Sequence, residues 1–322
     1  MLAFLKLIRI QNLLIIAFTQ YVVRWCIIYP IIKVSSTFYE LQLSELNFFL
    51  LVLSTVMIAA AGYIINDYFD ISIDKVNKPE RMVIGKGVKR RVAIGAHTVI
   101  NFLAIAIALY VANSIGSWRL ALIHFVCAGG LWFYSTSFKR QFLIGNVVIA
   151  LFTALVPMIA VIYEMIPIYR EYIPIEENLS FKSVWEYTIA LSFFAFITTL
   201  LREIIKDIED VDGDMEYGCK TMPILIGIRA TKNIAMFIAF LTIICLVFIQ
   251  IEFIKIDDYV SLIYFIVALQ IPLLFLIYKI KVASEKKQFR FAGNFSKFIM
   301  LMGIFYLFVF AYPILHDFLN VI

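Results

Sequence analysis

Two stretches of the chain carry three aspartates each at the same spacing, and both directly follow long apolar runs. They are Asp67, Asp70 and Asp74 in the first stretch, and Asp207, Asp210 and Asp214 in the second. On a helix, residues separated by three and then four positions lie within about 60° of one another. Each stretch therefore predicts a helix end with three carboxylates on one face.

Carboxylates crowded on one helix face raise one another's pKa values unless cations compensate their charge. Mg²⁺ suits such a face, because it binds oxygen and usually combines one or two carboxylates with water and substrate phosphate. Helix ends with unrelated, solvated charges are the simpler alternative, but the duplicated spacing argues against it. We expect all six aspartates to ligate Mg²⁺ around a bound diphosphate. The carboxylates expected to be catalytic are Asp67, Asp70, Asp207 and Asp210.

A diphosphate also needs hydrogen-bond donors, and polar side chains of this kind lie near both aspartate stretches. The candidates are Asn66, Lys75, Arg81, Lys139, Arg140 and Lys206. Arginine can hold two phosphate oxygens at once, and lysine acts as a compact positive charge. Each basic residue could instead serve only to orient the chain in a membrane. We expect these six residues to bind the diphosphate.

The composition excludes a soluble domain. Of the 322 residues, 63% are hydrophobic and 16% are charged, and the mean hydropathy is +0.92. Soluble domains are typically about half apolar and a quarter charged. The N-terminus lacks the pattern of a cleaved signal, so residues 12–30 predict a retained first span. The four cysteines lie far apart, which argues against disulfides and against a thiolate metal site.

Nine apolar runs are long enough to cross a bilayer, which takes about 20 residues. They cover residues 12–32, 47–66, 92–112, 119–136, 143–163, 184–205, 233–251, 259–278 and 298–315. Their continuity excludes a membrane barrel of short alternating strands, and an open sheet cannot exist in lipid. We therefore predict an all-α, polytopic bundle of about nine transmembrane helices. The whole chain, residues 1–322, is expected to form a single integral membrane domain, with no nucleic-acid partner.

The basic residues are distributed unequally between the predicted loops. With the N-terminus inside, 21 lysines and arginines fall on the inner side and five on the outer side. Such an excess is typical of the cytoplasmic face. We expect a multi-pass protein of the cell (inner) membrane, with the N-terminus and both aspartate stretches facing the cytoplasm. Carboxylates at span ends, rather than near the membrane midplane, disfavour the alternative of a transporter with an acidic ion site.

The same residues resemble the motifs of the UbiA superfamily of intramembrane prenyltransferases. The first stretch with its preceding Asn66 is similar to NDxxDxxxD, and the second stretch is similar to DxxDxxxD. Further positions that resemble the family are Arg9, Asn12, Asn77, Pro79, Arg81 (with Glu80 inserted before it), Tyr134, Ser135, Lys139, Arg140, Gly145 and Asn146. The resemblance covers essentially the whole chain. It implies a UbiA-like fold in which Mg²⁺, held by the aspartates, binds a prenyl diphosphate.

The resemblance also implies the reaction and an acceptor class. Ionisation of the prenyl diphosphate would give an allylic carbocation, which a membrane-soluble acceptor captures. The second stretch, followed by Gly218, Thr221 and Pro223, is most similar to the branch of digeranylgeranylglyceryl phosphate synthases. This similarity implies a geranylgeranyl group as donor and geranylgeranylglyceryl phosphate as acceptor. Chlorophyll synthases and homogentisate prenyltransferases share a similar pattern, so an aromatic quinone precursor is the alternative acceptor.

Overall fold

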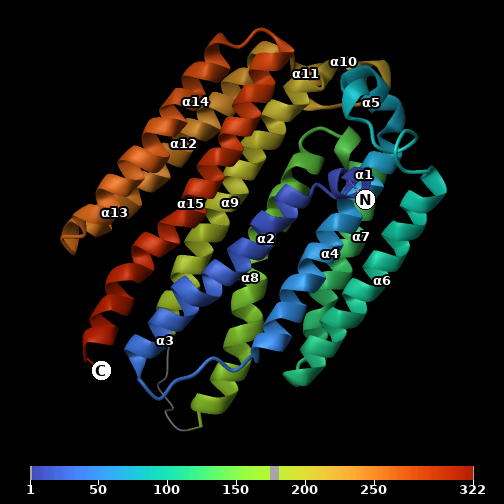
Figure 1. Cartoon of the computed structure of the whole chain (residues 1–322). Helices are drawn as coiled ribbons and strands as arrows, with labels where there is room; N and C mark the ends of the chain where they lie inside the picture. The colour runs from blue at the N-terminus through green and yellow to red at the C-terminus, as the bar shows by residue number, and fades with distance from the viewer. Residues whose placement is uncertain (1, 175–180, 322) are drawn as a thin grey trace. The chain divides into compact units, whose positions relative to one another are not determined.

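The computed structural model describes residues 2–174 and 181–321, and within them all side chains except those of Arg81 and residues 317–321. Helices follow one another along the chain in Figure 1, and no strand forms in these ranges. The all-α prediction is therefore confirmed. The chain divides into two compact units, each considered by itself. They are Met1–Phe138 with Leu155–Thr188, and Lys139–Ala154 with Ile189–Ile322.

The first unit is built from the N-terminal helices. It contains α1 (Leu2–Leu7), α2 (Ile10–Val23), the π-helical segment η1 (Arg24–Ile28), α3 (Tyr29–Ser35), α4 (Glu45–Phe69), α5 (Ile71–Asn77), the 3₁₀ turns η2 (Pro79–Arg81) and η3 (Trp118–Leu120), α6 (Arg90–Ser114) and α7 (Ala121–Thr136). Two long helices belong to both units. Helix α8 (Ile144–Tyr172) begins in the second unit and ends in the first, whereas α9 (Lys182–Glu209) begins in the first and ends in the second.

The second unit is built from the C-terminal helices. Besides its parts of α8 and α9 it contains α10 (Val211–Glu216), α11 (Met222–Ile226), α12 (Ile228–Lys255), α13 (Tyr259–Tyr264), the π-helical η5 (Phe265–Gln270), α14 (Ile271–Val282) and α15 (Lys286–Val321). The 3₁₀ turn η4 (Phe138–Arg140) lies at the boundary. Helix α15 begins 12 residues before the predicted span 298–315, because its lysine-, arginine- and glutamine-containing start favours helix without being apolar.

Among the described residues, eight helical segments are long and apolar enough to cross a membrane. They are Ile10–Ser35, Glu45–Phe69, Arg90–Ser114, Ile144–Tyr172, Lys182–Glu209, Ile228–Lys255, Tyr259–Val282 and Lys286–His316. The remaining predicted span, residues 119–136, forms η3 and α7. Helix α7 has 16 residues and falls short of the 18 that the length criterion requires. The prediction of about nine spans is confirmed to within this one helix.

Helix α4 carries the first aspartate stretch and begins at a side-chain cap. The Ser44 hydroxyl accepts the backbone N–H of Asn47 at 3.2 Å, and Glu45 complements the positive end of the helix dipole. Further along, Gly62 packs against α7. A Cβ added at Gly62 would come within 2.8 Å of Leu131 Cδ1, so the missing side chain lets the two helices approach closely.

Helix α9 carries the second aspartate stretch and packs against α15. The ring of Phe194 lies where a Cβ of Gly303 would be, and Gly293 also faces α9. The Ser296 hydroxyl donates to the carbonyl of Thr198 at 3.5 Å. Small residues on one face of α15 thus set the distance to α9, as is typical of membrane helices.

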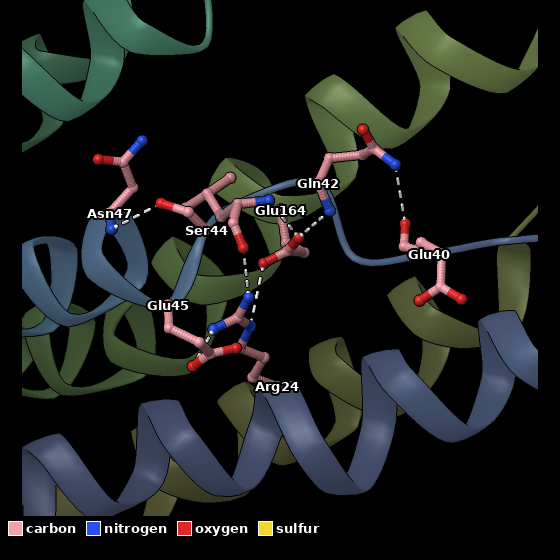
Figure 2. A network of polar contacts seen from close by, with 8 residues as sticks. Arg24, Glu40, Gln42, Ser44, Glu45, Asn47 and Glu164 are labelled. Carbon is pink, nitrogen blue, oxygen red and sulfur yellow. Dashed lines mark hydrogen bonds and ion pairs between the residues drawn. The ribbon is translucent and has the colours of Figure 1, made fainter.

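A buried ion pair joins the first span to α8 within the first unit (Figure 2). Arg24 is 1% exposed, and its Nε lies 3.3 Å from Oε2 of Glu164, which is fully buried. Glu164 also accepts the backbone N–H groups of Gln42 and Leu43 at 2.7 and 2.9 Å. Arg24 donates to the Leu43 carbonyl at 2.5 Å and to Glu45 at 3.1 Å. The connection between α3 and α4 is therefore hydrogen-bonded to both members of the ion pair, Arg24 of η1 and Glu164 of α8.

Candidate active site

The first aspartate stretch contains a helix break at its middle aspartate. Asp70 has φ −86° and ψ 0°, between the end of α4 and the start of α5. The expectation of one unbroken helical face is therefore wrong at this residue. The hydrogen-bond ladder nevertheless continues, because Asp70 N–H donates to Asn66 O at 3.0 Å and Asp74 N–H donates to Asp70 O at 2.8 Å. The amides of Asp70 and Asp74 therefore stay paired although the helix is interrupted.

The amide of Asn66 positions the middle carboxylate. Its Nδ2 donates to Oδ2 of Asp70 at 2.8 Å, and both side chains are buried. The Oδ1 atom of Asn66 is buried and has no hydrogen-bond partner within the described residues. A buried amide oxygen beside a carboxylate is a suitable ligand for a hard cation.

Arg9 lies against the first aspartate. Its Nη2 donates to Oδ1 of Asp67 at 2.8 Å, and its guanidinium lies 4.8 Å from the ring centre of Tyr63. Asn12 Nδ2 donates to the Tyr63 hydroxyl at 3.1 Å and holds the ring. Burial opposes the charge of Arg9, but Asp67 acts against burial, and the net effect raises the pKa of Arg9 above its ordinary value. The site therefore includes a permanent positive charge.

Arg9 also has an unusual backbone. It separates α1 from α2 with φ 52° and ψ 55°, the left-handed region that few residues other than glycine adopt. The other predicted residues of this unit are less tightly placed. Asp74 is half-buried on α5, whereas Lys75 is exposed, and no hydrogen bond or ion pair in the described part of the unit joins Lys75 to the aspartates. The side chain of Arg81 lies outside the described residues.

The second aspartate stretch repeats the break of the first. Asp210 has φ −98° and ψ 6°, between α9 and α10. Its N–H donates to Lys206 O at 2.9 Å, and Asp214 N–H donates to Asp210 O at 3.1 Å. The two stretches therefore share a local backbone design as well as a spacing, which could not be read from the spacing alone.

A side chain from α8 holds the first aspartate of this stretch. Asn146, which is 7% exposed, donates from Nδ2 to Oδ2 of Asp207 at 2.8 Å. The backbone carbonyl of Arg140 accepts the N–H of Lys220 at 2.8 Å, so the loop before α8 is joined to the loop after α10. Lys139 is half-buried in this loop, and the Arg140 side chain is exposed. The structure thus joins the segment that holds Lys139 and Arg140 to the loop that follows the second stretch.

Other charged residues near the end of α9 form ion pairs of their own. Lys206 Nζ lies 3.6 Å from Glu203 Oε2, and Arg202 Nη1 donates to the other oxygen of Glu203 at 2.5 Å. Glu209 accepts a hydrogen bond from Nε of Arg290, on α15, at 2.8 Å. Glu209 thus has a partner on α15. Lys206 remains a predicted diphosphate ligand. In the structure its side chain forms an ion pair with the carboxylate of Glu203.

Within the described residues, no group of three or more His, Cys, Asp or Glu side chains is arranged to enclose a metal by itself. Mg²⁺ rarely needs such a cage, because it keeps several waters and binds substrate phosphates through the remaining positions. Two helix ends with oxygen donors, together with the free Oδ1 of Asn66, fit this chemistry. The residues that would hold Mg²⁺ are Asp67, Asp70 and Asp74 in the first unit, and Asp207, Asp210 and Asp214 in the second, each set considered by itself.

Arg9 and Asn146 were absent from the predicted site residues. Their contacts with Asp67 and Asp207 join positions 58 and 61 residues apart in the sequence. No local sequence pattern can predict a contact between residues so far apart in the sequence. The only sequence signal was their resemblance to polar positions of a family, which did not indicate a partner.

Comparison with known proteins identifies the family. Residues 35–302 match the UbiA prenyltransferase family, and this match covers most of the chain. The chain therefore belongs to the UbiA prenyltransferase family, as its motifs predicted. With eight candidate spans it is a multi-pass integral membrane protein. The family membership leaves no support for the transporter alternative.

Curated relatives of similar sequence are named digeranylgeranylglyceryl phosphate synthase. The one from Thermococcus kodakarensis is 33% identical over 205 residues, which is 63% of this chain and 65% of the relative. The one from Sulfurisphaera tokodaii is 32% identical over 246 residues, 75% of this chain and 76% of the relative. The match with the Thermococcus protein thus spans slightly less than two thirds of that protein's length.

Solved structures agree with the fold. A structure described as digeranylgeranylglyceryl phosphate synthase in membranes is 22% identical, with a TM-score of 0.61, and covers 96% of this chain and 97% of that chain. A UbiA homologue from Archaeoglobus fulgidus, bound to DMAPP and Mg²⁺, is 17% identical, with a TM-score of 0.54, and covers 94% and 98% of the two chains. These likenesses confirm a UbiA-like helical fold.

Proposed function

We propose that this protein is a Mg²⁺-dependent prenyltransferase that moves a geranylgeranyl group from its diphosphate onto geranylgeranylglyceryl phosphate. The observation that carries the proposal is the similarity to relatives named digeranylgeranylglyceryl phosphate synthase, at 32–36% identity. The two aspartate stretches support it, since each presents carboxylates of the kind that Mg²⁺ prefers. A distantly similar structure that holds a prenyl diphosphate, DMAPP, together with Mg²⁺ is a second support.

The reaction breaks the bond between C1 of the prenyl chain and the diphosphate oxygen, and the electron pair leaves with the diphosphate. A bond forms between C1 and the hydroxyl oxygen of the acceptor, whose proton is released. Mg²⁺ would supply charge neutralisation for the departing diphosphate. The chain's own residues hold the carboxylates in place, through Asn66 for Asp70 and Asn146 for Asp207. Arg9 and Lys139 provide positive charge for the leaving group.

The prenyl chain and the acceptor are both lipids, and a membrane bundle suits them. The apolar spans offer a medium that dissolves a chain of this kind and keeps water from an allylic cation. Aromatic faces, which can stabilise a cation, are plentiful, with 30 Phe and 17 Tyr. An aromatic quinone precursor is the alternative acceptor, and it would require the same donor chemistry.

The test uses purified protein in detergent with Mg²⁺ and radiolabelled geranylgeranyl diphosphate. Geranylgeranylglyceryl phosphate and 4-hydroxybenzoate are offered in parallel, and the lipid products are separated. We expect label in the glyceryl phosphate product, and none without a divalent cation. Transfer to 4-hydroxybenzoate alone would overturn the acceptor and retain the reaction class. An absence of transfer to either acceptor, in protein that is correctly inserted and monodisperse, would contradict the proposal.

The proposed location is the cell membrane, with the N-terminus and both aspartate stretches in the cytoplasm. The support is the excess of 21 basic residues over five between the two sides of the predicted topology. The water-soluble diphosphate product would then be released into the compartment where prenyl diphosphates of this kind are used.

A further inference from the structure

The first aspartate of each stretch is held by a donor from the beginning of another helix, but the two donors differ in charge. For Asp67 the donor is Arg9, which directly precedes α2. For Asp207 the donor is Asn146, the third residue of α8. A guanidinium neutralises the carboxylate that it binds, whereas a neutral amide fixes a carboxylate and leaves its negative charge in place.

The position that corresponds to Asn66 in the second stretch is Lys206, because each directly precedes the first aspartate. Asn66 donates to an aspartate of its own helix, but Lys206 forms an ion pair with Glu203. The second stretch therefore has no asparagine in its own sequence at this position. Asn146 brings the equivalent chemical group, a buried side-chain amide, from α8.

The second stretch is also held from another side. Glu209, at the end of α9, accepts a hydrogen bond from Arg290 of α15 at 2.8 Å. The helix end is thus fixed on α15 by an ion pair that does not include any of the three aspartates. Among the hydrogen bonds shown for the described residues, the one from Asn146 reaches the Asp207 carboxylate itself. The backbone position and the carboxylate orientation are therefore fixed by different residues, which makes them separable by mutation.

From this geometry we infer that Asn146 is a positioning residue for divalent-cation binding at the second aspartate stretch. Its amide holds Oδ2 of Asp207 and leaves Oδ1 as the oxygen for a cation. The inference rests on the proposed function for the identity of the cation, and it goes further by assigning a role that neither the motif nor the family name contains. Side chains that orient metal ligands typically change metal affinity about 10–100-fold when removed.

The test measures Mn²⁺ binding by electron paramagnetic resonance, with the full-length protein in detergent and inorganic diphosphate present. Asn146→Leu keeps the side-chain size and removes the donor, and Asn146→Ala is the second variant if the first does not yield monodisperse protein. We expect Mn²⁺ affinity at least about tenfold weaker in either variant. Gln250→Leu is the matched control, because it also removes a buried amide of the second unit, bonded to Gln270, and it should leave Mn²⁺ affinity unchanged.

A double-mutant cycle with Asp207→Asn separates positioning from general destabilisation. If Asn146 acts through Asp207, the variant with both changes binds Mn²⁺ no more weakly than Asp207→Asn alone. Additive losses in the cycle, or normal Mn²⁺ affinity in Asn146→Leu, would overturn the inference while prenyl transfer by the unmodified protein stands. Loss of Mn²⁺ affinity in Asn146→Leu together with a failed transfer assay would instead retain the inference and reject the proposed acceptor reaction.

Discussion

At the residue scale, chemistry depends on carboxylates that must stay charged in a largely apolar protein. Asp70 is 4% exposed and Asp214 is 6% exposed. An ionised carboxylate removed from water requires hydrogen bonds or cations to remain stable. Donors from neighbouring residues supply part of this compensation, and a divalent cation would supply the rest. Substitutions at single aspartates should therefore affect the reaction much more than the fold.

Asp67→Ala and Asp207→Ala are each expected to abolish turnover, because each removes a proposed ligand and its charge. Membrane insertion should be unaffected, since both residues lie at helix ends. The measurement is prenyl transfer by variants whose insertion and monodispersity are first verified. Asp212→Ala is the control, as Asp212 is exposed and outside both sets of three. Near-normal transfer by correctly inserted Asp67→Ala protein would reject the metal-site assignment.

Lys139→Ala is expected to raise the KM for the prenyl diphosphate several-fold, with a smaller effect on the acceptor. The reason is that the half-buried Lys139 lies in the loop joined to the second stretch through Arg140 and Lys220. Steady-state kinetics with each substrate varied in turn give the two constants. Lys89→Ala is the control, because Lys89 is exposed and follows the first stretch without a predicted role at the site. Unchanged KM and kcat in Lys139→Ala would leave Lys139 only a topological role.

At the element scale, the two helices that carry aspartates depend on close packing at glycine. Gly303 of α15 faces Phe194 of α9, and Gly62 of α4 faces Leu131 of α7. An aromatic ring packed between helices moves less easily to make room for a methyl group than the end of a leucine side chain does. The contact at Gly303 is therefore the more sensitive of the two.

Gly303→Ala is expected to destabilise the protein by about 1–3 kcal/mol, as overpacking of a filled helix contact typically does. Phe194 must move to admit the methyl group, and α9 with its aspartates is displaced. Thermal unfolding in detergent measures the change. Gly95→Ala is the matched control, since no atom lies within 4 Å of a Cβ at Gly95, a helical position. That variant should be neutral or slightly more stable, and equal Tm values for both variants would contradict the packing argument.

The helices themselves could be predicted from the sequence, because long apolar runs in lipid leave the backbone no other way to satisfy its hydrogen bonds. The breaks at Asp70 and Asp210 could not. A 3.6-residue period describes a straight helix, and a residue that bends it while keeping its i→i+4 bonds leaves the pattern unchanged. The contacts of Arg9 and Asn146 escaped prediction for a related reason, since they depend on which helices become neighbours.

At the scale of the whole molecule, charge distribution determines how the chain is inserted. Most basic residues fall on one side of the predicted topology, and the aspartate stretches lie at the same ends of their spans. This arrangement places the proposed chemistry at one membrane surface. It can be tested without any substrate.

Single cysteines at two exposed positions test the orientation. Lys86→Cys, between η2 and α6, should react with a membrane-impermeant maleimide only after the cytoplasmic side is made accessible. Arg119→Cys, in η3, should react in intact cells. Three of the four native cysteines are buried, and Cys245 is partly exposed, so a Cys245→Ser background removes the main source of signal. Labelling of Lys86→Cys in intact cells would contradict the proposed topology and indicate the opposite orientation.

The network around Arg24 is a buried polar contact within the first unit. Arg24→Met leaves the fully buried Glu164 without its cation, and breaking such a pair typically destabilises by about 3–5 kcal/mol. Glu164→Gln should destabilise less, because it removes the charge and keeps an acceptor for the N–H groups of Gln42 and Leu43. Thermal unfolding in detergent measures which of the two variants is less stable. Lys255→Met, which breaks the exposed pair with Glu252, should change stability by about 1 kcal/mol or less.

The backbone hydrogen bonds of four aspartate amides at the two helix breaks have a thermodynamic consequence. Ordering the backbone of one residue removes about 1–2 kcal/mol of conformational entropy at room temperature. The amides of Asp70, Asp74, Asp210 and Asp214 are bonded in the protein alone, so a ligand does not have to order these residues when it arrives. These four amides should exchange slowly with deuterium even in the absence of ligand, and the heat capacity change on binding should report the prenyl chain entering an apolar environment rather than a folding of the aspartate stretches.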